Sequence, residues 1–338
     1  MLVVGDERCS AHLEGIGHPE SPARLRAIFE RLQAGGLLAE RREAREATPE
    51  ELSLVHPQRY VALVHDEIER LRGGPPEKPP AAYLSTGDTI IDASSWDAAT
   101  HAAGATLDAL DAAVEEGRAA FAVVRPPGHH AEPAKGMGFC LFNNAGIAAR
   151  AFVARSGGRA LVIDFDYHHG NGTEALVGNG VSYLSTHASP AYPGTGASYN
   201  NRIGSDGALI DIPLGLRYPT EGFVALWDET LRRLAAQLRP DLLVVSAGYD
   251  FAAGDPVGDL GVDITAAGAL GALIREVADE YCSGRAVFVL EGGYDLDLLG
   301  RGVEATIRAY DAGRSALGTA DAQAVPERER TLVDAVLA

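Results

Sequence analysis

The chain of 338 residues has few cysteines, no long apolar run and fewer basic than acidic residues. Its 3 cysteines, Cys9, Cys140 and Cys282, stand far apart and match no zinc-finger spacing, which argues against a disulfide framework. No apolar run approaches the roughly 18 residues that a membrane helix needs. The start, MLVVGDERCS, lacks the basic segment of a signal peptide. These absences predict a protein of the reducing cytoplasm with no membrane partner.

The charge balance excludes another class of partner. Lys and Arg total 29 against 47 Asp and Glu, a formal net charge of −18. Nucleic-acid binders need basic patches, so we expect no nucleic-acid partner. The sequence also shows no internal repeat and no long linker.

Apolar strand-like runs alternate with longer helical stretches along the chain. This alternation predicts an open, mostly parallel α/β sheet with helices on both faces. We expect a single domain over residues 1–338, with the core in about 1–312 and a peripheral tail at 313–338, and a loop at Gly73–Pro80. The expected strands are Leu2–Val4, Phe121–Arg125, Arg159–Phe165, Val181–Thr186, Ala208–Ile212, Asp241–Ser246 and Ala286–Leu290. The expected helices are Pro22–Ala34, Pro49–Leu52, Gln58–Arg72, Ser95–Glu116, Asn144–Ala154, Glu221–Leu238, Ala266–Cys282 and Leu296–Tyr310.

Polar residues follow five of the expected strands, where open α/β sheets bind ligands. In the segment LVIDFDYHHG (Leu161–Gly170), residues two apart share a face of the strand, so Asp164, Asp166 and His168 point the same way. Carboxylates entering a buried sheet need a counter-charge, and Asp and His are ligands that zinc accepts. A salt-bridged strand end facing a cleft is the alternative for this segment alone.

Six ordered motifs add to this pattern. They are RPPGHH (Arg125–His130), GFCLFNN (Gly138–Asn144), DFDYHHGNGTE (Asp164–Glu174), YPGTG (Tyr192–Gly196), SAGYDFAAGDP (Ser246–Pro256) and LEGGYD (Leu290–Asp295). In these motifs the chain resembles the zinc-dependent histone deacetylase superfamily, nearest the class II and bacterial deacetylase-like amidohydrolase and acetylpolyamine amidohydrolase branch. The resemblance covers about residues 12–310.

The resemblance implies one zinc ion per chain, with ligands Asp166, His168 and Asp255. Three protein ligands leave one coordination position for water or substrate, as a catalytic zinc requires. Asp250 and Asp259 flank Asp255 and are rival ligands, of which Asp250 is expected to brace its loop.

The paired histidines that follow the Pro-Pro-Gly turn suit the proton transfers of such a site. The resemblance implies that Asp164 orients His129 and that Asn171 orients His130. A carboxylate partner favours an imidazolium at His129, whereas the neutral amide leaves His130 able to take a proton from water.

The resemblance also implies groups that bind the substrate. Tyr294 would donate its hydroxyl to the substrate carbonyl oxygen. Phe139 and Tyr192 would flank a linear alkyl stem, and the carbonyl of Gly138 would receive the substrate N–H. A potassium site built from Asp164, Asp166, His168, Ser185 and Thr186 is implied as well.

Other histidines receive no catalytic role. His169 is expected to point to the opposite face from His168, and His187 to support a loop. His12 and His18 lie in the N-terminal segment, near the rim of the site.

These residues predict a metal-dependent deacetylase that removes acetyl or acyl groups from amines, acting on acyl-lysine side chains or a small acylated amine. An acetylpolyamine amidohydrolase is the alternative substrate class, and an apolar Val262, seven residues after Asp255, favours acyl-lysine. An arginase-like ureohydrolase with two metals and a catalytically silent acyl-binding module are alternatives of other classes. A homo-oligomer is compatible with the sequence.

Overall fold

The computed structural model describes residues 1–72, 81–313 and 321–338, so the loop expected at 73–80 lies outside the described residues. Its main sheet has nine strands in the order β2-β1-β5-β11-β10-β6-β7-β9-β8. Every neighbouring pair is parallel except β8 and β9, which are antiparallel. The strands are β1 (Leu2–Val4), β2 (Arg41–Arg42), β5 (Ala120–Ala122), β6 (Ala160–Asp164), β7 (Val181–Ala188), β8 (Arg202–Ile203), β9 (Ala208–Leu214), β10 (Leu242–Ala247) and β11 (Ala286–Leu290).

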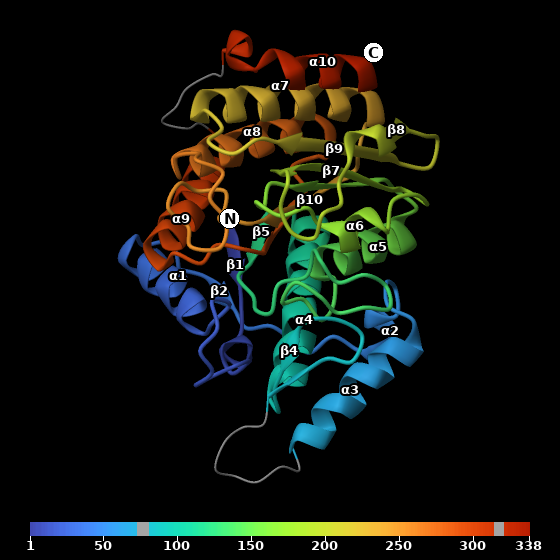
Figure 1. Cartoon of the computed structure of the whole chain (residues 1–338), viewed down its shortest axis with the longest axis vertical. Helices are drawn as coiled ribbons and strands as arrows, with labels where there is room; N and C mark the ends of the chain where they lie inside the picture. The colour runs from blue at the N-terminus through green and yellow to red at the C-terminus, as the bar shows by residue number, and fades with distance from the viewer. Residues whose placement is uncertain (73–80, 314–320) are drawn as a thin grey trace.

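Helices cover both faces of this sheet, as the alternating pattern predicts (Figure 1). On one face, α4 and α5 contact each other and the central strands. On the other face, α1 packs against α9, α9 against α8, and α8 against α7. The helices are α1 (Ala23–Ala34), α2 (Pro49–Leu52), α3 (Gln58–Arg72), α4 (Ser95–Glu115), α5 (Asn144–Ser156), α6 (Asn171–Glu174), α7 (Thr220–Leu238), α8 (Ala266–Tyr281), α9 (Leu296–Ala312) and α10 (Glu327–Val336).

All seven expected strands and eight expected helices are present, with ends that shift by a few residues. The four strands that the sequence did not indicate have two residues each: β2, β8 and the small hairpin of β3 (Ala82–Tyr83) and β4 (Ile90–Ile91). Such short strands carry too few residues to show an alternating pattern.

The turn chemistry explains where helices begin and end. Thr48 and Glu51 form a capping box at the start of α2, and Gly157 ends α5 with a left-handed φ of 68°. Ser21 does not cap α1: the helix begins at Ala23 after Pro22, and no side chain caps it.

Of the tail expected at 313–338, the structure describes residues 313 and 321–338, which include α10. Helix α10 lies against α7 at one end of the molecule (Figure 1), and the side chain of Val333 is buried there. Among the described residues no helix is long and apolar enough to cross a bilayer.

Candidate active site

The polar segments that follow five of the expected strands meet at one edge of the sheet because these strands are neighbours. Strands β5, β11, β10, β6 and β7 are consecutive in the sheet and run in the same direction. Their carboxyl ends therefore share one rim, where the segments after each strand fold over the sheet.

A cluster of potential metal ligands lies at the centre of this rim. Asp166, His168 and Asp250 each place a ligand atom within 4.8 Å of the other two. His168 Nδ1 lies 3.2 Å from an Asp166 oxygen and 3.0 Å from an Asp250 oxygen. Asp166 and Asp250 are buried, so their charges need a cation close by. Oxygen and imidazole donors around buried negative charge fit a zinc ion.

Asp255, the third ligand implied by the sequence, does not belong to that compact group. One of its carboxylate oxygens accepts the N–H groups of Val257 and Gly258, both at 3.0 Å. The other accepts the N–H groups of Tyr294 and Asp295 at 2.6 and 2.9 Å. Asp255 therefore sits next to the Gly-Gly-Tyr turn, with four backbone donors fixing its carboxylate.

Glycines make room for the Asp166 carboxylate. A Cβ at Gly248 or at Gly292 would overlap the Asp166 side chain, and Gly292 also donates its N–H to Asp166 at 2.8 Å. The glycines of the SAGYD and EGGYD motifs are thus required for the carboxylate to enter the sheet edge.

The two histidines of the RPPGHH motif are held by the partners that the resemblance implies. His129 Nδ1 lies 3.1 Å from Asp164 Oδ2, and His130 Nδ1 lies 2.9 Å from Asn171 Oδ1. The Asn171 amide donates to Glu132 at 2.8 Å, which orients its oxygen toward His130. Since an amide oxygen only accepts, His130 carries its proton on Nδ1 and a lone pair on Nε2.

The surroundings of His129 and His130 shift the pKa values of their imidazoles in opposite directions. Burial disfavours the charged form of His129, but Asp166 and Asp164 outweigh it and raise its pKa to about 10. Burial and then the charges of His129 and His168 hold the pKa of His130 well below its ordinary value. One ring is therefore an imidazolium and the other a neutral base, the pattern expected of an acid and base pair. The neutrality of His130 comes from burial and like charge, not from its amide partner, whose hydrogen bond raises the pKa.

Tyr294 lies in the turn after β11, next to the backbone of Gly293. Its ring centroid is 6.0 Å from that of Phe139, and the Arg24 guanidinium lies 5.0 Å from the ring centroid. Burial holds the pKa of Tyr294 well above its ordinary value, so the hydroxyl keeps its proton and is a hydrogen-bond donor.

Aromatic residues surround the approach to the histidines. The Tyr192 ring centroid is 5.0 Å from His130 and 6.3 Å from His168. Phe139 has a left-handed φ of 70°, and its ring packs edge-on against His18 at 4.6 Å. Gly138 also has a positive φ, and a Cβ there would overlap the His130 ring.

Comparison with known proteins agrees with this arrangement. A family model described as "Histone deacetylase domain" matches residues 18–310. The chain belongs to the histone deacetylase family. As a member of that family, it is a deacetylase, a hydrolase of amide bonds.

Several known proteins are similar over most of this deacetylase. "Histone deacetylase 10, chloroplastic" of Oryza sativa is 35% identical, covering 87% of this chain and 69% of the relative. A "Probable deacetylase" of Archaeoglobus fulgidus is 34% identical, covering 87% of this chain and 81% of the relative. The solved "HDA15 HD domain" superposes with a TM-score of 0.81 at 32% identity, over 99% of this chain and 93% of that one.

The structure of the deacetylase adds a rim residue that the sequence did not indicate. Asp88 accepts the Gly138 N–H at 2.8 Å and the Tyr192 hydroxyl at 3.0 Å. It thereby ties together the two segments expected to flank the substrate. A single aspartate in a loop gives no signal of this kind, because its partners lie 50 and 104 residues away.

A buried network of ion pairs connects the N-terminal segment to the turns that carry the histidine pair and Tyr294. Glu20 binds the guanidinium of Arg125, the residue that begins the RPPGHH motif, and also pairs with Arg24 at 3.1 Å. Arg24 in turn donates to the carbonyl of Gly293 at 2.6 Å, next to Tyr294. Glu20 and Arg24 both lie in the segment GHPESPARL (17–25), which this network joins to the turn that carries Tyr294.

Glu291 is a second residue that the sequence did not single out. It accepts the N–H groups of Gly128 and His129 at 2.7 and 3.1 Å. Burial raises its pKa to about 7. Glu291 therefore fixes the turn that carries both histidines.

Three further residues, His12, His18 and Asp259, lie outside the group of metal ligands. His12 is buried and lies 2.9 Å from the Ser95 hydroxyl, so it supports the N-terminal segment. His18 contacts Phe139 at the rim, whereas Asp259 accepts the N–H of Gly261 within its own loop.

The apolar residue Val262 gives no information on the substrate. Its side chain is fully buried, and its carbonyl accepts the N–H of Ala253 at 2.8 Å. Its hydrophobicity reflects packing and does not distinguish an acyl-lysine from an acetylpolyamine substrate.

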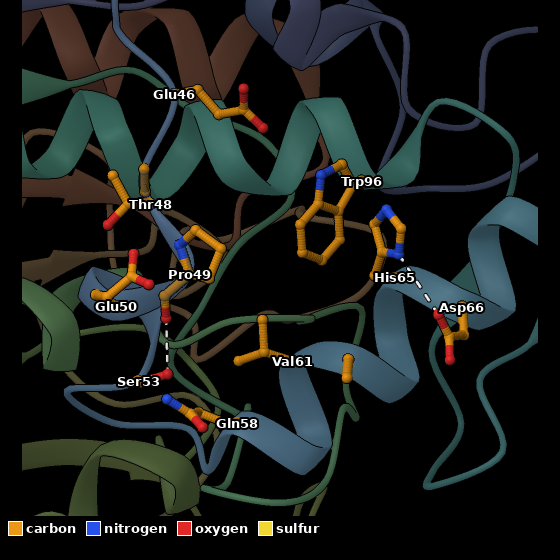
Figure 2. Close-up of a pocket in the computed structure, with 12 residues that line it drawn as sticks. Glu46, Thr48, Pro49, Glu50, Ser53, Gln58, Val61, His65, Asp66 and Trp96 are labelled. Atoms are coloured by element: carbon orange, nitrogen blue, oxygen red, sulfur yellow. Dashed lines mark hydrogen bonds and ion pairs between the residues drawn. The ribbon is translucent and has the colours of Figure 1, made fainter.

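A large surface pocket of about 710 Å³ lies apart from these residues. Figure 2 shows Trp96 and His65 on one side of it and Pro49 on the other, from α4, α3 and α2. None of the predicted site residues lines it. The catalytic chemistry therefore belongs to the strand ends and not to this pocket.

Proposed function

We propose that this deacetylase is a zinc-dependent amidohydrolase that releases acyl groups from acyl-lysine side chains. The proposal is carried by one observation: two adjacent histidines, each held by its own partner, lie beside the Asp166 and His168 cluster. This is the machinery needed to move a proton from water to a leaving amine.

Asp166, His168 and Asp255 would hold one zinc ion in this site. When bound, zinc polarises a carbonyl oxygen and lowers the pKa of a water molecule. Asp250 is the alternative third ligand, because it is closer to His168 in the structure. We favour Asp255 because a catalytic site must open toward substrate: Asp255 is 5% exposed and lies beside Tyr294, whereas Asp250 is fully buried.

The residues of the chain then divide the reaction between them. The Nε2 of His130 accepts a proton from the attacking water. The Tyr294 hydroxyl donates a hydrogen bond to the substrate carbonyl oxygen as negative charge develops there. Asp164 and Asn171 keep the two imidazoles in their tautomers, and either ring can deliver the proton that the departing amine needs.

Phe139 and Tyr192 would flank the alkyl stem of the substrate, while the carbonyl of Gly138 accepts its amide N–H. The names of those relatives that are called histone deacetylases support a lysine side chain of a protein as the source of this alkyl stem. An acylated polyamine or another small acylated amine is the alternative. An arginase-like reaction is disfavoured because it has no use for a tyrosine donor.

The remaining sequence expectations stay predictions. They are a potassium ion near Asp164, Asp166, His168, Ser185 and Thr186, a cytoplasmic location and a homo-oligomer. For the first, β6 and β7 pair Asp164 with Ser185 in register, which supports their proximity.

The substrate class is tested by parallel assays with the zinc-loaded protein. We expect turnover of a fluorogenic acetyl-lysine peptide with a kcat/KM at least about tenfold above that of N-acetylputrescine, and loss of activity after zinc removal by a chelator. A preference for N-acetylputrescine would transfer the proposal to acetylpolyamines. No turnover of any acylated amine by zinc-loaded protein would indicate a silent acyl-binding module.

The third ligand is tested by the matched variants Asp255→Asn and Asp250→Asn. We expect Asp255→Asn to lose the zinc that Asp166→Asn also loses, and Asp250→Asn to keep it, as measured by metal content per chain. The isosteric amides preserve packing while removing the charge that binds the ion. Loss of zinc in Asp250→Asn alone would assign the ligand to Asp250 instead.

A further inference from the structure

A second cluster of potential ligands lies on the opposite side of the segment that carries His168. His169, His187 and Asp211 each place a ligand atom within 4.8 Å of the other two. They come from the segment after β6, from β7 and from β9. Strand β6 pairs with β7, and β7 pairs with β9, which lies beside it in Figure 1. The sequence pattern indicates no chemical role for His169 or His187, and Asp211 stands out in no motif.

The cluster contains buried polar atoms without hydrogen-bond partners. Neither oxygen of the Asp211 carboxylate makes a hydrogen bond, and neither does His169 Nε2. Asp211 is 0% exposed and His169 is 1% exposed. A buried carboxylate without donors costs several kcal/mol unless a cation compensates it. A cation placed between these atoms would compensate their charge and accept their lone pairs.

The spacing of the atoms fits a metal ion between them. His169 Nε2 lies 3.2 Å from an Asp211 oxygen and 3.3 Å from a Glu174 oxygen, yet forms a hydrogen bond with neither. Tetrahedral zinc with bonds of about 2.0–2.2 Å separates its ligand atoms by about 3.4 Å. The two carboxylate oxygens thus lie at the distances from His169 Nε2 that separate ligands of one metal ion, and their geometry does not suit a hydrogen bond with this nitrogen.

The surroundings of both histidines are compatible with coordination. His169 Nδ1 lies 2.7 Å from the Thr195 hydroxyl, which accepts the Nδ1–H in the tautomer that leaves the Nε2 lone pair facing the carboxylates. His187 contacts the Ser185 hydroxyl and the Gly196 carbonyl, both at 2.9 Å, and coordination would replace one of these bonds.

We propose that His169, His187 and Asp211 form a second divalent transition-metal site, with Glu174 as the ligand on its exposed side. Imidazole and carboxylate ligands select zinc or a similar first-row ion. Thr195 and Gly196 belong to the segment that also carries Tyr192, so the ion would anchor this wall of the substrate channel to the sheet. The site is separate from the catalytic cluster and stands independently of the proposed deacylation chemistry.

The test is the metal content of the zinc-loaded full chain after dialysis, measured by mass spectrometry. We expect two zinc ions in the wild type, one in Asp211→Asn, one in Asp166→Asn and none in the double variant. Asp206→Asn, an exposed carboxylate in the turn before β9, is the matched control and keeps two. Circular dichroism establishes that each variant is folded.

The outcomes separate this site from the catalytic one. If wild type holds one ion and Asp166→Asn holds none, or if folded Asp211→Asn keeps two, the second site is overturned and the cluster is only a His–Asp contact. If wild type holds one ion that Asp211→Asn loses, the second site stands and the catalytic zinc fails. Should Asp211→Asn not fold, Glu174→Gln provides the test: we expect weaker retention of one ion, and unchanged retention of both would overturn the proposal.

Discussion

Replacing His130 by alanine lowers kcat by at least about 10²-fold while the protein keeps its catalytic zinc. General base catalysis by a positioned side chain contributes about 10²–10⁴-fold to a rate. His130 is the neutral ring of the pair, with its Nε2 lone pair free and its Nδ1–H bound to Asn171. Steady-state kinetics on the acetyl-lysine peptide and metal content per chain measure both parts of this expectation.

Two variants give the controls for His130. His65 is half exposed and lies in the remote pocket, so His65→Ala should leave kcat unchanged. Asn171→Ala removes the partner without removing the ring, and should reduce kcat less than His130→Ala does. Turnover at the wild-type rate by zinc-loaded His130→Ala would refute the assignment of His130 as the base.

Replacing Tyr294 by phenylalanine reduces kcat by about 10²–10³-fold, the loss seen when one oxyanion donor is removed. The ring keeps its contacts with Phe139 and Arg24, so the change removes the hydroxyl alone. Because the hydrogen bond strengthens as the carbonyl oxygen gains charge, the loss should appear in kcat more than in KM.

Tyr199→Phe is the matched control, since Tyr199 is 87% exposed. Its kinetics should equal those of the wild type. A loss of less than about threefold in Tyr294→Phe would show that this hydroxyl does not contact the reacting carbonyl.

The longer strands and helices were predictable from their apolar patterns, whereas the two-residue strands β2, β3, β4 and β8 were too short to show one. The prediction that Asp166 and His168 share a strand face was wrong, because β6 ends at Asp164 and both residues lie in the bend that follows it. Their proximity comes from the path of this bend, which brings His168 Nδ1 within 3.2 Å of an Asp166 oxygen. Contacts between residues that are far apart along the chain could not be predicted from the sequence. Arg24 reaches the turn before Tyr294 across 269 residues, and Asp88 reaches Tyr192 across 104.

The third metal ligand shows the same limit within one motif. Asp250 and Asp255 both follow β10, and only the path of the loop decides which carboxylate approaches His168. Spacing predicts the motif but not that path. The second cluster was missed for a related reason: Asp211 lies inside an ordinary buried strand, and its relation to His169 depends on the pairing of β7 with β9.

The close packing of backbone against the Asp166 and His130 side chains limits how this enzyme can diversify. Positions 138, 248 and 292 have no space for even a methyl group. Random mutagenesis aimed at a wider substrate range should therefore leave these positions untouched. Asp88 and Tyr192 are the better targets, since both side chains are exposed and they are joined to each other by a hydrogen bond of 3.0 Å.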